Sequence, residues 1–127
     1  MNNKIYTDGS YRDGKGTFAI DIYNDIQRVK EITAICDANS SNKTELLAVL
    51  YALHQNKGMP ANLYTDSKYV HDIANGKMKA KANKELWALY PQLKGDVNIC
   101  YVKGHDKCLR NNRVDKRAHT KLKTIFR

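Results

Sequence analysis

The chain has 127 residues, of which 42% are hydrophobic and 28% are charged, and 22 Lys and Arg against 13 Asp and Glu give a formal net charge of +9. This length and balance are typical of one globular domain whose core needs no disulfides, so we expect a single domain over residues 1–127. No apolar run is long enough to span a membrane. The three cysteines lack the spacing of a zinc site or a disulfide framework. We therefore expect a soluble, monomeric, cytoplasmic protein.

The positive charge is concentrated in two segments. Residues 76–84 carry four basic and no acidic side chains, and residues 101–127 carry nine basic and two acidic ones, while residues 1–75 are close to neutral. An electropositive half on a neutral body is typical of proteins that bind polyanions such as nucleic acids. A merely solubilising surface would have the same composition, so charge alone leaves both interpretations open.

Three β-prone runs open the chain. They cover residues 4–7, 17–23 and 28–36, and in the second run Phe18, Ile20 and Ile22 alternate onto one face. The first run stops at Asp8-Gly9-Ser10, and Asn24-Asp25 resembles a hairpin turn. Successive strands joined by short turns predict an antiparallel meander.

The hydrophobic period then becomes that of a helix. Apolar side chains recur at helical spacing from residue 43 to residue 57, with Ser40 or Ser41 as the cap. The remaining elements that we expect are a strand at 62–65, a helix capped by Ser67 that ends near Ile73, a helix at 85–93, a strand at 97–102, and a last helix that opens at Asn111 or Asn112.

This order of elements predicts an α/β fold. Helices between strands imply crossover connections, and therefore parallel strands beside the initial hairpins. We expect a mixed five-stranded sheet with three antiparallel strands, two further parallel strands, and helices on both faces.

Four carboxylates stand at the ends of these elements. Asp8 and Asp66 directly follow predicted strands, Glu45 lies in the first turn of the long helix, and Asp115 opens the last helix. Taken singly, such residues are usually turn, dipole or capping residues. Several carboxylates that converge, however, need cations to stay ionised, and oxygen ligands suit Mg²⁺ or Mn²⁺. Such a cluster in a basic protein is typical of metal-dependent phosphodiester cleavage.

Four sequence blocks resemble the type 1 ribonuclease H family, in matching order from Lys4 to Leu122. They are Tyr-Thr-Asp8-Gly-Ser, Asn42-Lys-Thr-Glu45-Leu-Leu-Ala, Tyr-Thr-Asp66-Ser-Lys-Tyr-Val, and Val-Lys-Gly-His105 leading to Asn111-Asn-Arg-Val-Asp115. The resemblance implies the ribonuclease H-like fold. It also implies an endonuclease that hydrolyses the RNA strand of RNA–DNA hybrids, leaving 5′-phosphate and 3′-hydroxyl ends.

The resemblance also implies roles for residues. Asp8 would bridge two Mg²⁺ ions, with Mn²⁺ as a substitute. Asp115 would help to hold the ion that activates water, and Glu45 and Asp66 the ion beside the leaving 3′ oxygen. His105 matches a histidine that aids proton transfer or product release. Substrate contacts would come from Gly9, Ser10, Ser40, Ser41, Asn42, Lys43 and Lys68.

The chain departs from many family members in two regions, and the first is residues 11–16, which stand where many members have a Gly-Asn-Pro-Gly stretch. The segment before the helix at 85–93 is short, basic and free of Trp, where many bacterial members have a Trp-rich basic protrusion, and we interpret Trp87 as a core residue. Three alternatives remain open: a ribonuclease H domain of a reverse transcriptase, another nuclease of the same fold such as a resolvase or exonuclease, and a non-catalytic hybrid-binding protein. The Val-Lys-Gly-His block and the complete carboxylate set favour the hybrid ribonuclease.

Overall fold

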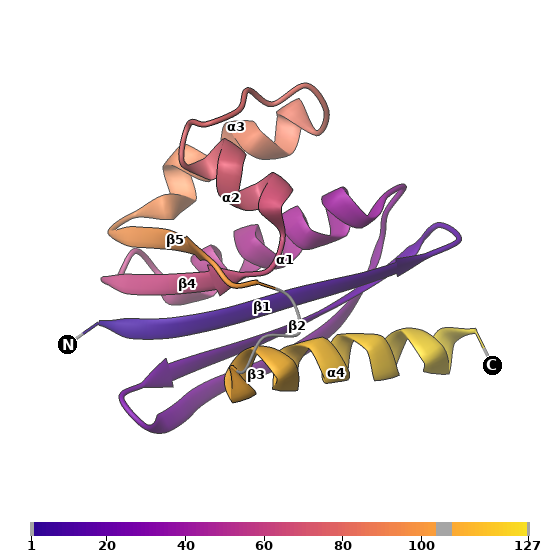
Figure 1. Ribbon diagram of the computed structural model, residues 1–127, viewed down its shortest axis with the longest axis horizontal. Helices are drawn as coiled ribbons and strands as arrows, with labels where there is room; N and C mark the ends of the chain where they lie inside the picture. Colours follow the sequence, from indigo (N-terminus) through magenta and orange to yellow (C-terminus); the bar gives the residue numbers. More distant parts are fainter. Residues whose placement is uncertain (1, 104–107, 127) are drawn as a thin grey trace.

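One mixed sheet organises the chain (Figure 1), and the computed structural model describes residues 2–103 and 108–126. The strands are β1 (Asn3–Arg12), β2 (Lys15–Asn24), β3 (Gln27–Asp37), β4 (Ala61–Thr65) and β5 (Val97–Tyr101). The helices are α1 (Ser41–Asn56), α2 (Lys68–Ala74), α3 (Lys84–Lys94) and α4 (Leu109–Ile125). None of the described helices has the length and apolar character needed to cross a bilayer.

The strands lie in the order β3-β2-β1-β4-β5. β1, β2 and β3 pair antiparallel, whereas β4 pairs parallel with both β1 and β5. The predicted α/β fold with three antiparallel and two further parallel strands is therefore confirmed. The parallel pairs follow from the crossovers through α1 and through α2 and α3, because helical connections return each strand in the same direction.

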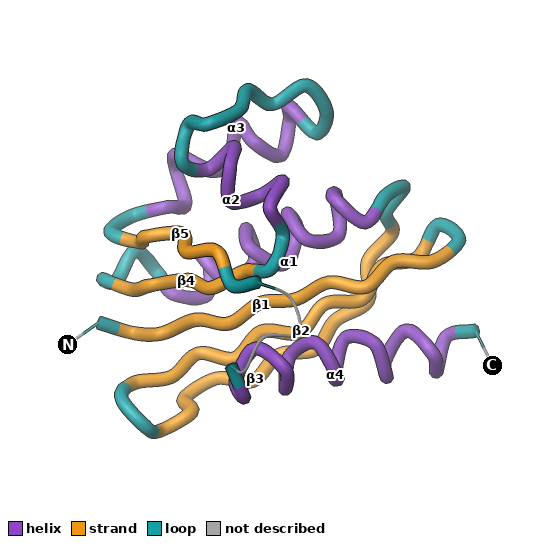
Figure 2. Tube along the Cα trace, in the orientation of Figure 1, coloured by secondary structure: helices purple, strands orange, loops and turns teal. Residues whose placement is uncertain are grey.

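Helices cover both faces of the sheet (Figure 2). On one face, α1, α2 and α3 enclose the larger core, which includes Ile5, Leu46 and Leu63. On the other face, α4 runs along β1 and β2 and covers a smaller cluster with Tyr6 and Val114 at its centre. Neighbouring residues of β1 thus serve opposite faces, as side-chain alternation in a strand requires.

The first strand extends further than the sequence predicts. Asp8-Gly9-Ser10 does not form a turn, because β1 continues to pair with β2 as far as the Arg12↔Lys15 pair. The chain reverses instead at Asp13 and Gly14, whose φ angles are 45° and 84°. The expectation that Asp8 follows a strand is therefore wrong: Asp8 lies within β1.

Helix boundaries place the other acidic residues. Ser40 is the cap of α1 and Ser67 the cap of α2, since each hydroxyl oxygen accepts a hydrogen bond from a first-turn backbone N–H at 3.1 Å. The prediction that Asp115 opens the last helix is wrong, because α4 begins earlier, at Leu109, after Cys108 in the capping position. At 3.6 residues per turn, Asp115 therefore lies near the end of the second turn.

Candidate active site

Two of the acidic residues lie where two parallel strands stop pairing. The last pair between β1 and β4 is Tyr6↔Tyr64, and β4 ends at Thr65. Asp66 follows β4 at once, and Asp8 lies two residues beyond Tyr6 on β1. The neighbouring strands therefore bring these two carboxylates to one edge of the parallel pairing, the edge at which open α/β sheets bind their ligands.

Glu45 reaches this edge from α1, which covers the opposite face of the sheet from α4. One carboxylate oxygen from each of Asp8, Glu45 and Asp66 lies within 4.8 Å of the others. The close approach of α1 to β1 depends on Gly9, since a Cβ there would lie 2.9 Å from Glu45 Oε1. The glycine after Asp8 is thus a steric requirement of the cluster.

Asp115 approaches the cluster from α4. Its side chain lies within hydrogen-bonding reach of Asp8, which itself is 3% exposed. α4 is fixed to the sheet beside it, because the hydroxyl of buried Thr17 donates to the carbonyl oxygen of Ala118 at 2.6 Å. Asp8, Glu45 and Asp66 thus lie within 4.8 Å of one another, and Asp115 approaches Asp8 from the other face of the sheet without belonging to that close group.

Burial and mutual repulsion raise the pKa of two of these groups. The pKa of Asp8 is raised by burial, then by the charge of Glu45 and by contacts with Asp115 and Asp66. The pKa of Glu45 is raised well above its usual value by burial and then by Asp66. Without cations the cluster therefore retains protons, as crowded carboxylates do.

The same cluster has the ligand chemistry of a divalent metal site. Glu45 Oε1 is buried and has no hydrogen-bond partner among the described residues. A buried carboxylate oxygen without a donor is costly unless a cation satisfies it. Oxygen donors from several carboxylates are the set that Mg²⁺ and Mn²⁺ prefer, so the residues present fit such ions.

The residues expected to contact substrate lie around this cluster. Gly9 and Ser10 continue β1 beyond Asp8, and Lys68 opens α2 as an exposed residue. The others gather at the start of α1, where Ser40 and Lys43 are partly exposed and Ser41 and Asn42 are exposed. A helix start offers free backbone N–H groups to anions.

A small polar pocket beside the α1 start was not predicted from the sequence. Lys43 lines it together with Asn83, Lys84, Glu85 and Leu86 at the start of α3. Asn83 has a left-handed φ of 58°, and an Asn before a helix is a signal that could have drawn attention to it. The two lysines outnumber the one carboxylate, that of Glu85, so the net charge around the hollow favours an anionic ligand.

The basic segment between α2 and α3 is tied to the core by one hydroxyl. Tyr69 Oη accepts hydrogen bonds from Trp87 Nε1 at 3.0 Å and Asn83 Nδ2 at 3.1 Å, and it donates to the carbonyl oxygen of Ala82. Trp87 is 8% exposed, so its interpretation as a core residue is confirmed. The lysines of this segment, Lys77, Lys79 and Lys81, are exposed.

Two other expectations have different outcomes. His105 lies outside the described residues, so its role stays a prediction. Arg117 and His119 on α4 contact β-strand residues near the cluster, and neither residue was singled out from the sequence. Both residues lie within about one helical turn of Asp115. This spacing indicates a place near the site only once α4 is known to pack on β1 and β2.

Residues 2–123 match the RNase H family. The chain belongs to the RNase H family. It is 35% identical to the ribonuclease H of Trichodesmium erythraeum over 134 residues, an alignment covering 90% of this chain and 84% of that protein. It is 31% identical to the ribonuclease H of Lachnoclostridium phytofermentans over 144 residues, which covers 94% of this chain and 91% of the relative. The family that the sequence blocks predicted is confirmed.

The chain has the same fold as solved structures of RNase H proteins. The crystal structure of LC11-RNase H1 in complex with an RNA/DNA hybrid superposes on this chain with a TM-score of 0.86, covering 99% of this chain and all of that one at 18% sequence identity. At this identity the likeness establishes the fold, and it confirms the predicted ribonuclease H-like architecture. The acidic cluster thus belongs to a member of a family of endoribonucleases.

Proposed function

We propose that this RNase H family member is an endonuclease that hydrolyses the RNA strand of RNA–DNA hybrids and leaves 5′-phosphate and 3′-hydroxyl ends. The observation that carries the proposal is the convergence of Asp8, Glu45 and Asp66 within 4.8 Å in a chain of this family with a net charge of +9. A protein that only bound nucleic acid would gain nothing from carboxylates facing phosphates.

Four residues would hold two divalent cations, Mg²⁺ with Mn²⁺ as a substitute. Asp8 contacts Asp115 on its α4 side and Glu45 and Asp66 on the other, which supports a bridging role for Asp8. When bound, two such ions supply positive charge that activates water and stabilises charge on the leaving 3′ oxygen. Glu45 and Asp8 would release their protons on binding, because the cations replace the proton as the neutralising charge.

The substrate surface would lie on both sides of these carboxylates. Backbone groups of Gly9 and Ser10 would face the RNA strand. Ser40 Oγ accepts from Lys43 N, so its hydroxyl hydrogen stays available to a phosphate. In the pocket that Lys43 and Lys84 line together with Asn83, Glu85 and Leu86, the two lysines would contact a phosphate of the other strand. Hydrogen bonds to the 2′-hydroxyl would distinguish RNA from DNA.

Other expectations stay predictions from the sequence. His105 would aid proton transfer or product release, and the single domain, the monomeric state and the cytoplasmic location are not needed for the mechanism. The Lys77 to Lys84 segment would add sequence-independent attraction for the hybrid. Affinity should therefore fall steeply with salt concentration.

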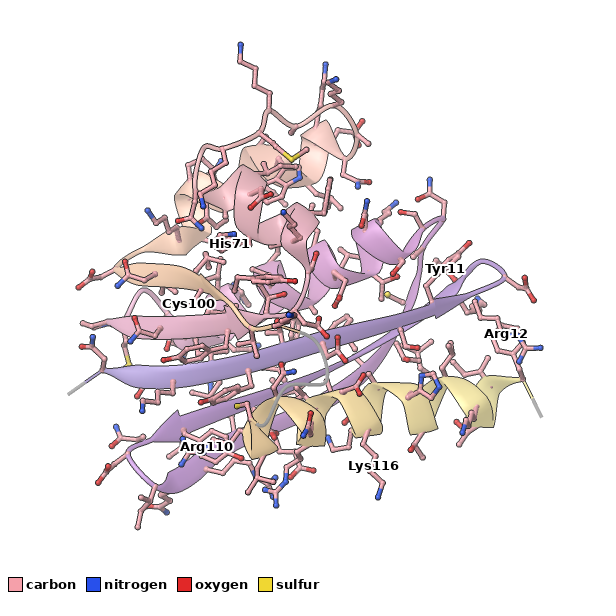
Figure 3. The ribbon with its side chains drawn as sticks, in the orientation of Figure 1. Tyr11, Arg12, His71, Cys100, Arg110 and Lys116 are labelled. Atoms are coloured by element: carbon pink, nitrogen blue, oxygen red, sulfur yellow. The ribbon has the colours of Figure 1, made fainter. Side chains whose placement is uncertain are left out.

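One labelled RNA tests the proposal in three forms: alone, in an RNA duplex, and in a DNA hybrid, each with Mg²⁺ or with EDTA. We expect internal cleavage of the hybrid alone and only with Mg²⁺, with products that carry 5′-phosphates. Asp8→Asn and Asp66→Asn should each reduce the rate by orders of magnitude. Lys116→Ala is the matched control on α4, since Lys116 points away from the sheet into solvent (Figure 3). Equal cleavage of all three forms, or full activity of Asp8→Asn, would contradict the proposal.

A further inference from the structure

Beyond the carboxylate cluster, β1 and α4 run side by side in the same direction (Figure 1). Asp8, Ser10 and Arg12 alternate onto the α4 face of β1. On α4, His119 lies one helical turn beyond Asp115. Ser10 Oγ lies 3.3 Å from His119 Nδ1, so a serine–histidine pair directly adjoins the Asp8–Asp115 pair.

The position of His119 is fixed by its two predecessors in the chain. Arg117 donates to the carbonyl oxygen of Ile32 at 2.7 Å and to Asp21. Ala118 accepts from the hydroxyl of Thr17. Both anchors are on strands of the sheet, so the backbone that carries His119 cannot rotate or slide without breaking them. A side chain on such a rigid element is well placed to recognise a ligand.

The histidine is accessible and offers a donor. His119 is exposed, and its Nδ1 faces the Ser10 hydroxyl. When that hydroxyl donates to Nδ1, the hydrogen of the neutral ring is on Nε2. In that tautomer the ring presents an N–H donor to solvent at one turn from the carboxylates.

The charge along this track changes sign away from the cluster. Asp8 and Asp115 are followed by Ser10 and His119, and then by Arg12, which lies against the C-terminal part of α4 (Figure 3), where its guanidinium is 4.8 Å from the centre of the Phe126 ring. Arg12 also forms an exposed ion pair with Asp13 at 3.7 Å. A strand whose cleaved phosphate lies at the carboxylates would therefore place its neighbouring phosphates against donors. This polarity fits a phosphodiester chain.

We propose that His119, oriented by Ser10, binds a phosphate of the RNA strand adjacent to the one that is cleaved. The proposal rests on the proposed function, because it assigns a new contact to the same substrate. His119 is a substrate-binding residue in this arrangement, and Ser10 is its positioning residue through the side chain.

Steady-state kinetics with the hybrid give the first test. His119→Ala should raise KM about tenfold, the usual size of a hydrogen bond to a charged group, and change kcat by less than about threefold. His119→Gln keeps an N–H donor and should recover part of the loss. Lys116→Ala on the same helix is the control and should leave KM unchanged. A KM for His119→Ala within about twofold of the unmodified chain would overturn the proposal.

Substrate modification locates the contact. A single 2′-deoxy methylphosphonate linkage is moved along the RNA strand and compared with the 2′-deoxy phosphate at the same position. At one position next to the cleaved phosphate, the uncharged linkage should weaken hybrid binding by the unmodified chain. It should not weaken hybrid binding by the His119→Ala variant. Equal losses for both proteins at every position would overturn the proposal. Binding is measured with Ca²⁺ in place of Mg²⁺, so this result is separate from any failure of the cleavage itself.

Discussion

Arg117 of α4 and Asp21 of β2 form a buried ion pair, in which Nη1 lies 2.5 Å from Oδ1. Asp21 is 0% exposed. The same guanidinium donates to the carbonyl oxygen of Ile32 and to Thr33 Oγ1 on β3. One side chain thus joins α4 to two strands, only two residues after Asp115.

Removing one partner of this ion pair should lower the free energy of unfolding far more than removing both partners. Arg117→Met leaves the Asp21 carboxylate buried with Arg28 at 3.8 Å, and we expect it to lower the free energy of unfolding by about 3 kcal/mol. Arg117→Met combined with Asp21→Leu should recover most of this loss, since no unpaired charge remains. Urea denaturation of both variants tests the expectation. A double variant no more stable than the single one would contradict it.

The sequence predicted the strand around Asp21 but not the fate of this residue. Alternation correctly indicated that Phe18, Ile20 and Ile22 share a buried face. The residues between them lie on the other face, which α4 covers, as the expectation of helices on both faces requires. The partner of Asp21 is 96 residues away in the chain, and no local pattern reports such a distant contact.

The metal-free protein should lose stability as the pH rises. Folding raises the pKa of Asp8 and of Glu45, so the folded chain keeps protons that the unfolded chain releases above about pH 4. Their favourable contribution is present below that pH and is lost as the pH rises toward the folded pKa values, by at most about 1.4 kcal/mol per pH unit for each group.

Urea denaturation in EDTA between pH 5 and pH 8 measures this slope. Asp8→Asn removes one of the two groups, so its stability should fall less steeply, and it should exceed the unmodified chain most clearly at pH 8. Saturating Mn²⁺ should reverse the order by binding only the folded, unsubstituted cluster. Parallel slopes for the two proteins would show that Asp8 does not retain its proton.

A methyl group at residue 9 should disturb the cluster without touching a charge. In Gly9→Ala the new Cβ would lie 2.9 Å from Glu45 Oε1 and 3.0 Å from Thr44 Cγ2, so the glutamate must move. We expect Mn²⁺ affinity, measured by calorimetry, to fall about tenfold or more. Gly58→Ala is the control. A Cβ at residue 58 would have no described atom within 4 Å, so this variant adds backbone strain at a φ of 74° without any steric contact. Equal affinities for Gly9→Ala and the unmodified chain would contradict the steric role of Gly9.

Two element boundaries near the site escaped prediction for physical reasons. Asp8-Gly9-Ser10 has the composition of a turn, but pairing of Gly9 with Phe18 and of Ser10 with Thr17 extends β1 through it. α4 begins before its polar Asn residues because Cys108 takes the capping position without a side-chain hydrogen bond. In both places tertiary contacts outweigh local propensity. The placement of Asp8, Glu45 and Asp66 near element ends, together with the family resemblance, nevertheless predicted their convergence.

The hydroxyl of Tyr69 should matter more for the basic segment than for the carboxylates. Tyr69→Phe leaves Trp87 Nε1 and Asn83 Nδ2 without their shared acceptor, and we expect a loss of about 1–2 kcal/mol in unfolding free energy. Hybrid affinity should fall, while Mn²⁺ affinity should not change. Fluorescence of Trp87 during urea denaturation and a binding titration measure both effects. A loss of Mn²⁺ affinity as large as that of Gly9→Ala would contradict this separation.

Anomalous diffraction from a crystal of the unmodified chain soaked in MnCl₂ tests most directly whether the four acidic residues form one metal centre. We expect two peaks roughly 3.5–4 Å apart, both contacted by Asp8, with Asp115 on one ion and Glu45 and Asp66 on the other. No peak among these side chains at saturating Mn²⁺, or ions bound without Asp8, would contradict the mechanism.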